Sequence, residues 1–470
     1  MERIAGKDAL FLWSETPTTL MQMAFVGVFD PAELGSSGAD PAAVFRRFKD
    51  VLAARLHLVP RFRQRVIDVP FGLDNPYFVD DPDFDLDRHV GRLALPSPGG
   101  QAELEDLIGR MVSRPLDATR PLWDLVCVEG LADGRWAYVG RAHHVLVDGV
   151  GGNDILLQLL DLTPEPRDVP PPDEPFDPAP IPSPAAVLRH AAAGQARWPS
   201  RVAGTVKRTA EVAYDVARWS LSRPEDHGHL RVLGPRTFLN GPVGPDRQVA
   251  FGRLPLERVK AVKNEVGCTV NDVVLAITGL GLRAFLAEHG EEPDKGLVAA
   301  VPISIRKADD PAGGNQVSGM TVPLFDDVAD ARAQLEAVAR ATRPAKEQLG
   351  AVAAAVLTDW SEHAVPAVAA QAFRFYSRMG LARRHPPIAN VTLSNVPGPP
   401  VPLYLAGSRL EAMFPIGPVI HNQRCNLTVV SYLDTMFLGA VADASHVPPI
   451  AGLVGHLEDA VKHLADELGV

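Results

Sequence analysis

A proline-dense stretch in the middle of the chain limits the folds open to it. Ten prolines fall between Pro164 and Pro184. Proline has no amide hydrogen and fixes φ, so this density excludes a regular helix or a central strand and favours an extended crossing over the surface. The sequence therefore predicts an N-terminal half over residues 1–163, a crossover over 164–235 that includes basic amphipathic helices, and a C-terminal half over 236–470.

The composition is that of a folded protein with more than one domain. The length of 470 residues predicts two or three domains, and 46% hydrophobic with 22% charged residues is ordinary globular usage. The net charge of -11 argues against a general nucleic-acid binder, because such a protein needs a basic face. Cys127, Cys268 and Cys425 form no CxxC pair, so neither a disulfide framework nor a zinc site is indicated, and a reducing cytoplasm fits.

No targeting or membrane-spanning segment is expected. The N-terminus, MERIAGKDALFLWSE, has no long apolar run behind a basic start, so it does not resemble a secretory signal. The apolar runs at 273–286 and 347–373 are interrupted by polar or charged residues before they reach the roughly 18 residues of a spanning helix. We therefore expect a protein that is soluble or lies on a membrane surface.

Strand and helix patterns are mixed along the whole chain. Short apolar or alternating runs predict strands, and apolar residues at helical spacing predict helices. The expected strands lie at 21–30, 120–130, 134–144, 247–256, 296–307, 390–400 and in at least two segments of 415–444. The expected helices lie at 41–59, 101–116, 185–223, 257–267, 268–286 and from 450 onward. This mixture predicts an α/β fold with α+β mixed sheets.

The strand at 134–144 ends on two histidines, His143 and His144, in the stretch HHVLVDG. Successive side chains on a strand point to opposite faces, so both rings cannot face one site. One histidine is therefore expected to be chemical and the other structural. Asp148, just before Gly149, lies where the chain turns and is better placed to fix local geometry than to touch a substrate. The alternative interpretation is a hydrogen-bonded pair in the core, but the Asp-Gly turn favours a site.

Two basic and aromatic stretches stand out in this acidic chain. Residues 185–223 hold seven Lys or Arg against Glu211 and Asp215, and residues 373–384 read FRFYSRMGLARR. Such stretches can lie on anionic lipid headgroups. The alternative is that they form helices packed on the body with a solvated basic face.

Several enzyme classes lack their residues in this chain. The sequence contains no GxSxG elbow, P-loop, complete GxGxxG or HExxH, which argues against serine-hydrolase, nucleotide-hydrolase, dinucleotide-binding and zincin chemistry. A metal site from His143, His144 and Asp148 is disfavoured because neighbouring strand histidines diverge. A neutral histidine can instead take a proton from a hydroxyl group.

Several motifs together resemble one known family. HHVLVDG matches the HHxxxDG signature of coenzyme-A-dependent acyltransferases and of peptide-synthetase condensation domains. RPLW, NDVVLA, VPISIR with GNQVSG, LSNVPGP and the N-terminal DALFLW look like the bacterial wax ester synthase/acyl-CoA:diacylglycerol acyltransferase family, over nearly the whole chain. The resemblance implies two chloramphenicol-acetyltransferase-like domains, with a central channel between them and the histidine motif at its centre.

The resemblance also implies roles for individual residues. His144 resembles the general base and His143 its supporting neighbour, while Asp148, beside Gly149, resembles a structural, orienting carboxylate with Arg306 as its ion-pair partner. The candidates for oxyanion donors or channel residues, with helix capping and strand-end hydrogen bonding as the alternative roles, are Asn271, Asp272, Ser394 and Asn395. The residues that resemble the family's PLW motif, interpreted as mainly structural, are Pro121, Leu122 and Trp123.

The implied activity is the transfer of a long-chain acyl group from acyl-CoA to the hydroxyl of diacylglycerol, and also of long-chain alcohols to give wax esters. A histidine base would act without an acyl-enzyme, with the coenzyme A thioester as co-substrate and no bound cofactor or metal. We expect a cytoplasmic protein with peripheral contact to the inner face of the plasma membrane or to a lipid droplet, and no nucleic-acid partner; its oligomeric state is left open.

Two alternatives to this activity stay open. One is a carrier-protein-dependent or condensation-like acyltransferase that makes another lipid ester. The other is a non-catalytic lipid-binding relative, which the intact motif disfavours.

Overall fold

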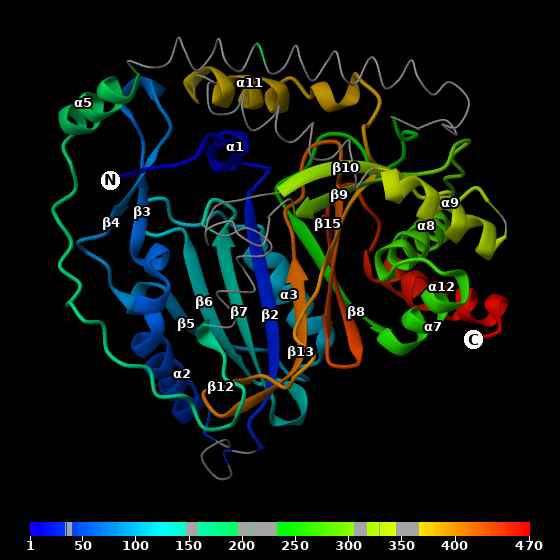
Figure 1. Ribbon diagram of the computed structural model, residues 1–470, viewed down its shortest axis with the longest axis horizontal. Helices are drawn as coiled ribbons and strands as arrows, with labels where there is room; N and C mark the ends of the chain where they lie inside the picture. The colour runs from blue at the N-terminus through cyan, green and yellow to red at the C-terminus, as the bar shows by residue number, and fades with distance from the viewer. Residues whose placement is uncertain are drawn as a thin grey trace.

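Two six-stranded β-sheets, counted over the residues that the structure describes, form the body of the protein (Figure 1). The computed structural model describes residues 1–32, 34, 40–146, 158–195, 207, 233–304, 317–328, 330–344 and 366–470. The N-terminal sheet has the strand order β12 (Tyr404–Leu405), β13 (Ser408–Ile416), β2 (Gln22–Asp30), β7 (Trp136–His143), β6 (Trp123–Glu129) and β5 (Val90–Ala94). The C-terminal sheet has the order β10 (Val317–Pro323), β9 (Val298–Ser304), β11 (Val391–Val396), β14 (Cys425–Tyr432), β15 (Thr435–Asp443) and β8 (Arg247–Pro255). Parallel and antiparallel pairs occur in both sheets, which confirms the predicted α/β fold with mixed sheets.

The histidine-bearing strand β7 lies in the interior of the N-terminal sheet. It pairs antiparallel with β2 and β6, so the predicted hairpin of β6 and β7 is confirmed. Asp133 and Gly134 in the turn adopt φ values of 64° and 73°, the left-handed conformation that tight hairpin turns favour. Helix α2 (Pro41–Arg55) covers this sheet, and its Phe48 packs edge-on against Tyr138 of β7.

A hairpin from the C-terminal half completes the N-terminal sheet. β13 pairs antiparallel with β2, from Arg409 opposite Asp30 to Ile416 opposite Ala24. The predicted division treats 236–470 as one continuous C-terminal half and so omits this exchanged hairpin, β12 and β13, which belongs to the N-terminal sheet. β13 also passes close to β15 of the C-terminal sheet. A Cβ added to Gly439 of β15 would lie only 1.8 Å from the carbonyl oxygen of Pro415 in β13.

Helix α3 (Gln101–Val112) joins the halves a second time. It belongs to the N-terminal half but packs on β8 of the other sheet, where Gln101 Nε2 donates to the Phe251 carbonyl (2.9 Å) and the Phe251 amide donates to Glu105 (2.8 Å). The halves therefore share both strands and helices.

The C-terminal sheet is covered on one side by a group of helices (Figure 1). They are α7 (Leu256–Val266), α8 (Val270–Glu288), α9 (Ala331–Pro344) and α12 (Ala451–Leu468). Among the described residues α8 is the one helix long and apolar enough to cross a membrane, with a mean hydropathy of 1.5. Its side chains belong to the core of the C-terminal half, and this burial accounts for its composition.

The remaining elements are a small sheet and several helices. A small sheet has the order β1 (Glu2–Arg3), β4 (Tyr77–Asp80) and β3 (Gln64–Ile67). The other helices are α1 (Gly6–Ser14), α5 (Pro184–Gln195) and α11 (Pro366–Arg378). The short 3-10 helices are η2 (Leu56–Leu58), η3 (Pro60–Arg63), η4 (Pro70–Gly72), η5 (Leu86–Arg88), η6 (Ala132–Gly134) and η8 (Leu381–Arg383).

The proline-dense connector has no regular secondary structure over residues 164–183 and is mostly exposed, which confirms the predicted surface crossing. In Figure 1 it runs along the outside of the N-terminal half, from near β12 up to α5. The expected helix over 185–223 is described only for α5 and Lys207; residues 196–206 and 208–232 lie outside the described part.

Candidate active site

A cavity of about 1180 Å³ lies between the two sheets. Strands β2, β6 and β7 contribute residues to one wall, and strands β9, β11 and β14 contribute residues to the other. The wall is mainly apolar, and alternate residues of β11 (Thr392, Ser394) face it because side chains alternate along a strand. The cavity occupies the place of the expected central channel.

His144 lines this cavity directly after β7, which ends at His143. Its backbone amide donates to the Met21 carbonyl (2.8 Å), which holds the chain where the strand ends. Its ring stacks on Phe11 of α1, with ring centroids 4.0 Å apart and an angle of 8° between the planes. This stacking restricts the rotation of the imidazole, so the ring is oriented before a substrate arrives.

His143 points to the other side of the strand and is buried. Its Nδ1 accepts a hydrogen bond from the Val145 amide (3.0 Å), so Nε2 carries the hydrogen and donates to the Glu15 carboxylate (2.7 Å). Both ring nitrogens are therefore engaged in holding the turn after β7. The divergence of the two histidine rings that the strand end predicts is confirmed.

Glu15 is a residue that reasoning from the sequence missed. It follows α1 and is 128 residues away from His143 along the chain. It stands two residues beyond DALFLW, the N-terminal motif of the resemblance. That proximity is the one signal in the sequence, because no local spacing links a carboxylate to so distant a histidine.

Replacing Glu15 with alanine should lower kcat by about 10- to 100-fold, because a hydrogen bond to a charged group contributes roughly 1.5–3 kcal/mol and each 1.4 kcal/mol is tenfold. KM should change little, since Glu15 acts on the orientation of His143. The measurement is steady-state kinetics of the Glu15→Ala and Glu15→Gln variants. Glutamine keeps an acceptor oxygen and should restore most of kcat; equal losses in both variants would contradict this role.

The PLW segment holds the edge of the site. The Leu122 carbonyl accepts from the His143 amide (2.9 Å), and the Trp123 indole Nε1 donates to the Phe62 carbonyl (2.7 Å). The Trp123 ring stacks on Phe62 and on His89, with centroids 4.7 and 4.4 Å apart. These contacts support the predicted structural role, and Trp123 also lines the cavity.

The other predicted channel residues divide between the cavity and the scaffold. Ser394 lines the cavity, but its strand neighbour Asn395 is not among the described lining residues, as strand alternation requires. Asn271 and Asp272 at the start of α8 also do not line it. The N-cap of α8 is Thr269, not the predicted Asn271 or Asp272.

Asp272 is instead committed to local structure. Its carboxylate accepts from the Thr269 amide (2.9 Å) and hydroxyl (2.7 Å), which completes a capping box, and from the Thr342 hydroxyl (2.7 Å). The capping alternative therefore describes this residue. The predicted Asp148–Arg306 ion pair and Gly149 lie outside the described residues.

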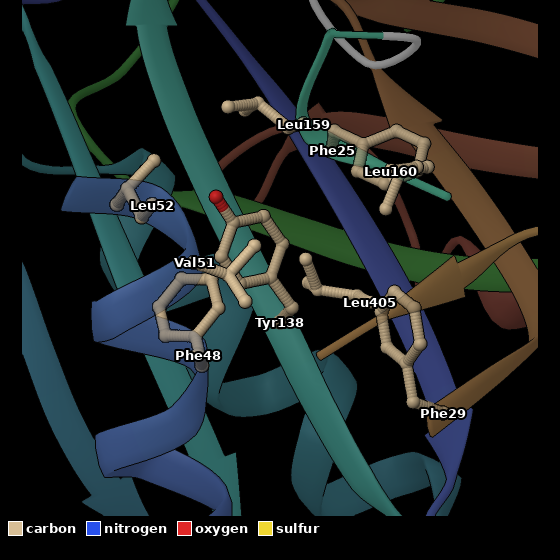
Figure 2. Close-up of a pocket in the computed structure, with 9 residues that line it drawn as sticks. All are labelled: Phe25, Phe29, Phe48, Val51, Leu52, Tyr138, Leu159, Leu160 and Leu405. Carbon is tan, nitrogen blue, oxygen red and sulfur yellow. The ribbon is translucent and has the colours of Figure 1, made fainter. Parts of the chain in front are cut away.

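A second, much smaller space borders the main cavity (Figure 2). It measures about 10 Å³, room for about one water molecule. Phe25, Tyr138 and Leu159 line both spaces, so they form the partition between them. The core behind the site is therefore nearly filled.

Over the described residues, no group of three or more His, Cys, Asp and Glu side chains could hold a metal ion.

Comparisons with known proteins place the chain in a family. Residues 4–274 match the model of the wax ester synthase/diacylglycerol acyltransferase catalytic domain, and residues 313–465 match the model of the corresponding C-terminal domain. A Mycobacterium tuberculosis protein with the provisional name diacylglycerol O-acyltransferase is 33% identical over 474 residues, which covers 99% of this chain and 90% of that protein. A second M. tuberculosis protein with the same provisional name is 34% identical over 471 residues, with 98% and 99% covered.

Solved structures agree with these matches. The wax ester synthase/diacylglycerol acyltransferase from Marinobacter aquaeolei superposes with a TM-score of 0.69 at 26% identity and covers both chains completely. The starter condensation domain of rhizomide synthetase, solved with C8-CoA, shares the fold at 15% identity, with a TM-score of 0.54 and 100% and 94% of the two chains covered. The chain belongs to the wax ester synthase/diacylglycerol acyltransferase family.

Proposed function

We propose that this protein is an O-acyltransferase that moves a long-chain acyl group from acyl-CoA to the hydroxyl of diacylglycerol, and also to long-chain alcohols. The observation that carries the proposal is the position of His144, an oriented imidazole on the wall of a large, mainly apolar cavity. The cavity volume of about 1180 Å³ exceeds the roughly 300–1,000 Å³ of ordinary small-molecule pockets. It suits two substrates that carry long apolar chains.

In the proposed reaction His144 removes the proton of the acceptor hydroxyl while the oxygen attacks the thioester carbonyl. The carbon–sulfur bond then breaks, and the departing thiolate takes the proton back from His144, so no acyl-enzyme forms. Ser394 is our candidate donor to the developing oxyanion, because it faces the cavity from β11. The coenzyme A thioester is a co-substrate.

The test is thiol release from palmitoyl-CoA, with diacylglycerol and hexadecanol supplied in parallel. We expect release with each acceptor and the matching ester as product. Release that requires a carrier-protein thioester instead would favour a condensation-like acyltransferase. No release with any donor would favour a lipid-binding protein without catalysis.

We also propose that α11 and the neighbouring 70–72 turn dock on an anionic lipid surface at the inner face of the plasma membrane. Phe71 is 83% exposed, Val368 66% and Phe375 59%. A Cβ on Gly72 would lie 2.8 Å from Ala367 Cβ, so the turn abuts the start of α11. The arginines on or just after this helix are Arg374, Arg378, Arg383 and Arg384.

The same helix reaches the cavity, which links docking to substrate entry. Phe373 and Tyr376 of α11 line the cavity wall, and Figure 1 shows α11 lying across one end of the molecule above α1. A lipid acceptor that leaves the membrane at α11 would therefore meet the cavity directly. This arrangement supports a peripheral, cytoplasmic enzyme that collects its acceptor from the lipid surface.

The variant Phe71→Asn/Phe375→Ser should bind anionic vesicles at least about tenfold more weakly, since burial of each phenylalanine contributes roughly 1.5–3 kcal/mol. Asparagine suits position 71 because the backbone there has φ 62°. Vesicle flotation with phosphatidylserine and phosphatidylcholine measures binding. The control is Leu162→Ser, which changes a 67% exposed residue just before the proline-dense connector; the same loss in this control would contradict a surface at α11.

A further inference from the structure

The loop between β13 and β14 presents three consecutive polar side chains to the mainly apolar cavity. They are His421, Asn422 and Gln423. The loop carries the chain from the N-terminal sheet back to the C-terminal sheet, so it lies at the junction of the two halves. No step of the proposed acyl transfer uses these residues.

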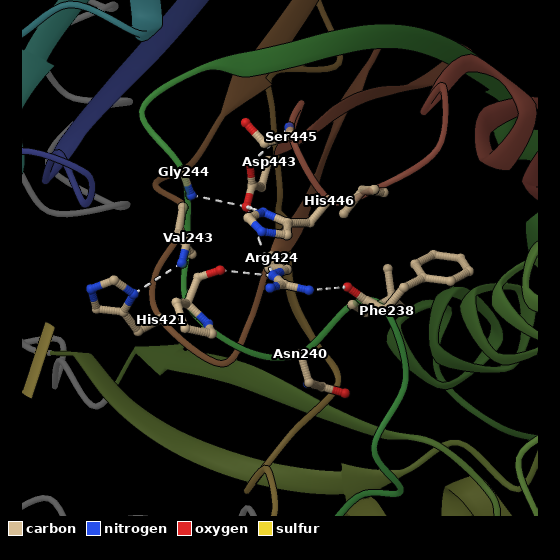
Figure 3. A network of polar contacts seen from close by, with 12 residues as sticks. Phe238, Asn240, Val243, Gly244, His421, Arg424, Asp443, Ser445 and His446 are labelled. Carbon is tan, nitrogen blue, oxygen red and sulfur yellow. Dashed lines mark hydrogen bonds and ion pairs between the residues drawn. The ribbon is translucent and has the colours of Figure 1, made fainter. Parts of the chain in front are cut away.

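The His421 ring has an N–H group that finds no hydrogen-bond acceptor among the described residues. Its Nδ1 accepts from the Val243 amide (3.1 Å), so the hydrogen is on Nε2, which is buried. Figure 3 shows the ring on the opposite side of Val243 from the network of Arg424 and Asp443. Burial first, and then the charges of Arg247 and Arg424, lower the His421 pKa, so the ring stays a neutral donor at pH 7.

Asn422 places both kinds of polar atom, each buried, next to the cavity. Its side chain lines the cavity at 6% exposure, and neither Oδ1 nor Nδ2 has a partner among the described residues. The backbone is fixed, because the Asn422 amide donates to the Gly241 carbonyl (2.7 Å) and Asn240 Nδ2 donates to the Asn422 carbonyl (2.7 Å). A buried amide without partners costs roughly 1–3 kcal/mol, which a ligand that pairs with it would recover.

The chemistry of this pair suits a neutral carbonyl group rather than an anion. His421 and Asn422 offer N–H donors without formal charge. The nearby guanidinium of Arg424 is engaged elsewhere, since its Nε donates to the Pro242 carbonyl and its Nη1 to the Phe238 carbonyl (2.9 Å each). A phosphate would find no free cation among these groups.

The position of the pair points to the lipid acceptor as the source of that carbonyl. Tyr376 of α11 lies next to His421, with ring centroids 6.0 Å apart. The pair therefore lies beneath the helix that we assign to the lipid surface. A diacylglycerol carries ester carbonyls beside its hydroxyl, whereas a simple long-chain alcohol has one hydroxyl, which must lie at His144.

We propose that His421 and Asn422 form a subsite for an ester carbonyl of the diacylglycerol acceptor, and that this subsite makes the enzyme favour glycerolipid over simple alcohol acceptors. The inference rests on the proposed function, because it names the acceptor of the same reaction. The pantetheine amides of coenzyme A are the other source of a neutral carbonyl, and the test separates the two.

The test compares kcat/KM for dioctanoylglycerol and for hexadecanol, with palmitoyl-CoA as donor, in two variants. Asn422→Gly removes the amide and keeps a residue that tolerates φ 69°, and His421→Asn keeps an acceptor for the Val243 amide but shortens the donor. We expect the ratio of dioctanoylglycerol to hexadecanol kcat/KM to fall about 5- to 100-fold in each variant. The matched control, Asp133→Gly at φ 64° in the distant β6–β7 turn, should leave the ratio unchanged.

Two results would overturn the inference while leaving the proposed function in place. One is an unchanged ratio in both variants, including the case in which activity falls equally with both acceptors. The other is a raised KM for palmitoyl-CoA, which would assign the pair to pantetheine. Absence of thiol release from the unmodified protein with either acceptor would instead remove the proposed function. If one variant fails to fold, the other gives the same ratio test.

Discussion

Replacing His144 with alanine is expected to lower the rate of coenzyme A release by about 10²- to 10⁴-fold, the contribution usual for a general acid–base group. The imidazole lines the cavity and is oriented by Phe11. In the proposed reaction this imidazole takes the hydroxyl proton and returns it to the leaving thiolate. Alanine leaves the cavity and the stacking surface in place but removes the base. Thiol release from palmitoyl-CoA with a saturating acceptor measures the loss.

The fold should survive this substitution, because His144 is half-buried and its backbone amide keeps the Met21 carbonyl as its acceptor. The thermal midpoint of unfolding should therefore stay within a few degrees of the unmodified value. The control is His456→Ala, which removes a histidine of α12 that bonds Glu288 at the surface. Full activity in His144→Ala would reject His144 as the base, and an equal loss in His456→Ala would point to a general effect of losing a histidine.

Local rules accounted for the part of the site that lies within one strand. Alternation along a strand sufficed to predict that His143 and His144 diverge, since that property depends on neighbouring residues alone. The same rule separates Ser394 from Asn395, but it does not say which of the two faces the cavity. That choice depends on which face of the C-terminal sheet packs on its helices. The six residues of β11 do not by themselves specify that packing.

Contacts between residues far apart in the chain could not be predicted from the sequence. Nothing near His143 specifies Glu15 as its partner, and nothing in the apolar pattern of β13 specifies pairing with β2 in the other half. Hydrophobic periodicity identifies a strand but not its neighbour. The N-cap of α8 lies two or three residues before Asn271 and Asp272. Thr, Asn and Asp are all good N-caps, so the residue type alone does not choose among them, and the capping box selects Thr269.

The largest effect on stability is expected at Arg55, where three distant segments meet. The Arg55 guanidinium donates to both carboxylate oxygens of Asp161 (2.7 and 2.9 Å) and to the Leu159 carbonyl (2.7 Å). Both side chains are 2% exposed. The Asp161 backbone in turn exchanges two hydrogen bonds with Tyr404 of β12 (2.8 Å each). The pair thus ties α2, the segment after the histidine turn and the exchanged hairpin together.

Arg55→Met should lower the free energy of unfolding by about 3–5 kcal/mol, because it leaves the Asp161 carboxylate buried without its counter-charge. Urea unfolding followed by tryptophan fluorescence measures the change. The double variant Arg55→Met/Asp161→Leu removes both charges and should recover part of the loss.

The control Arg120→Met breaks the exposed pair with Asp117 and should cost at most about 1 kcal/mol. A loss of similar size in this control, or no recovery in the double variant, would show that packing rather than the buried charge governs stability. Leu159, whose carbonyl accepts from Arg55, also lines the cavity, so the buried ion pair lies beside the candidate active site.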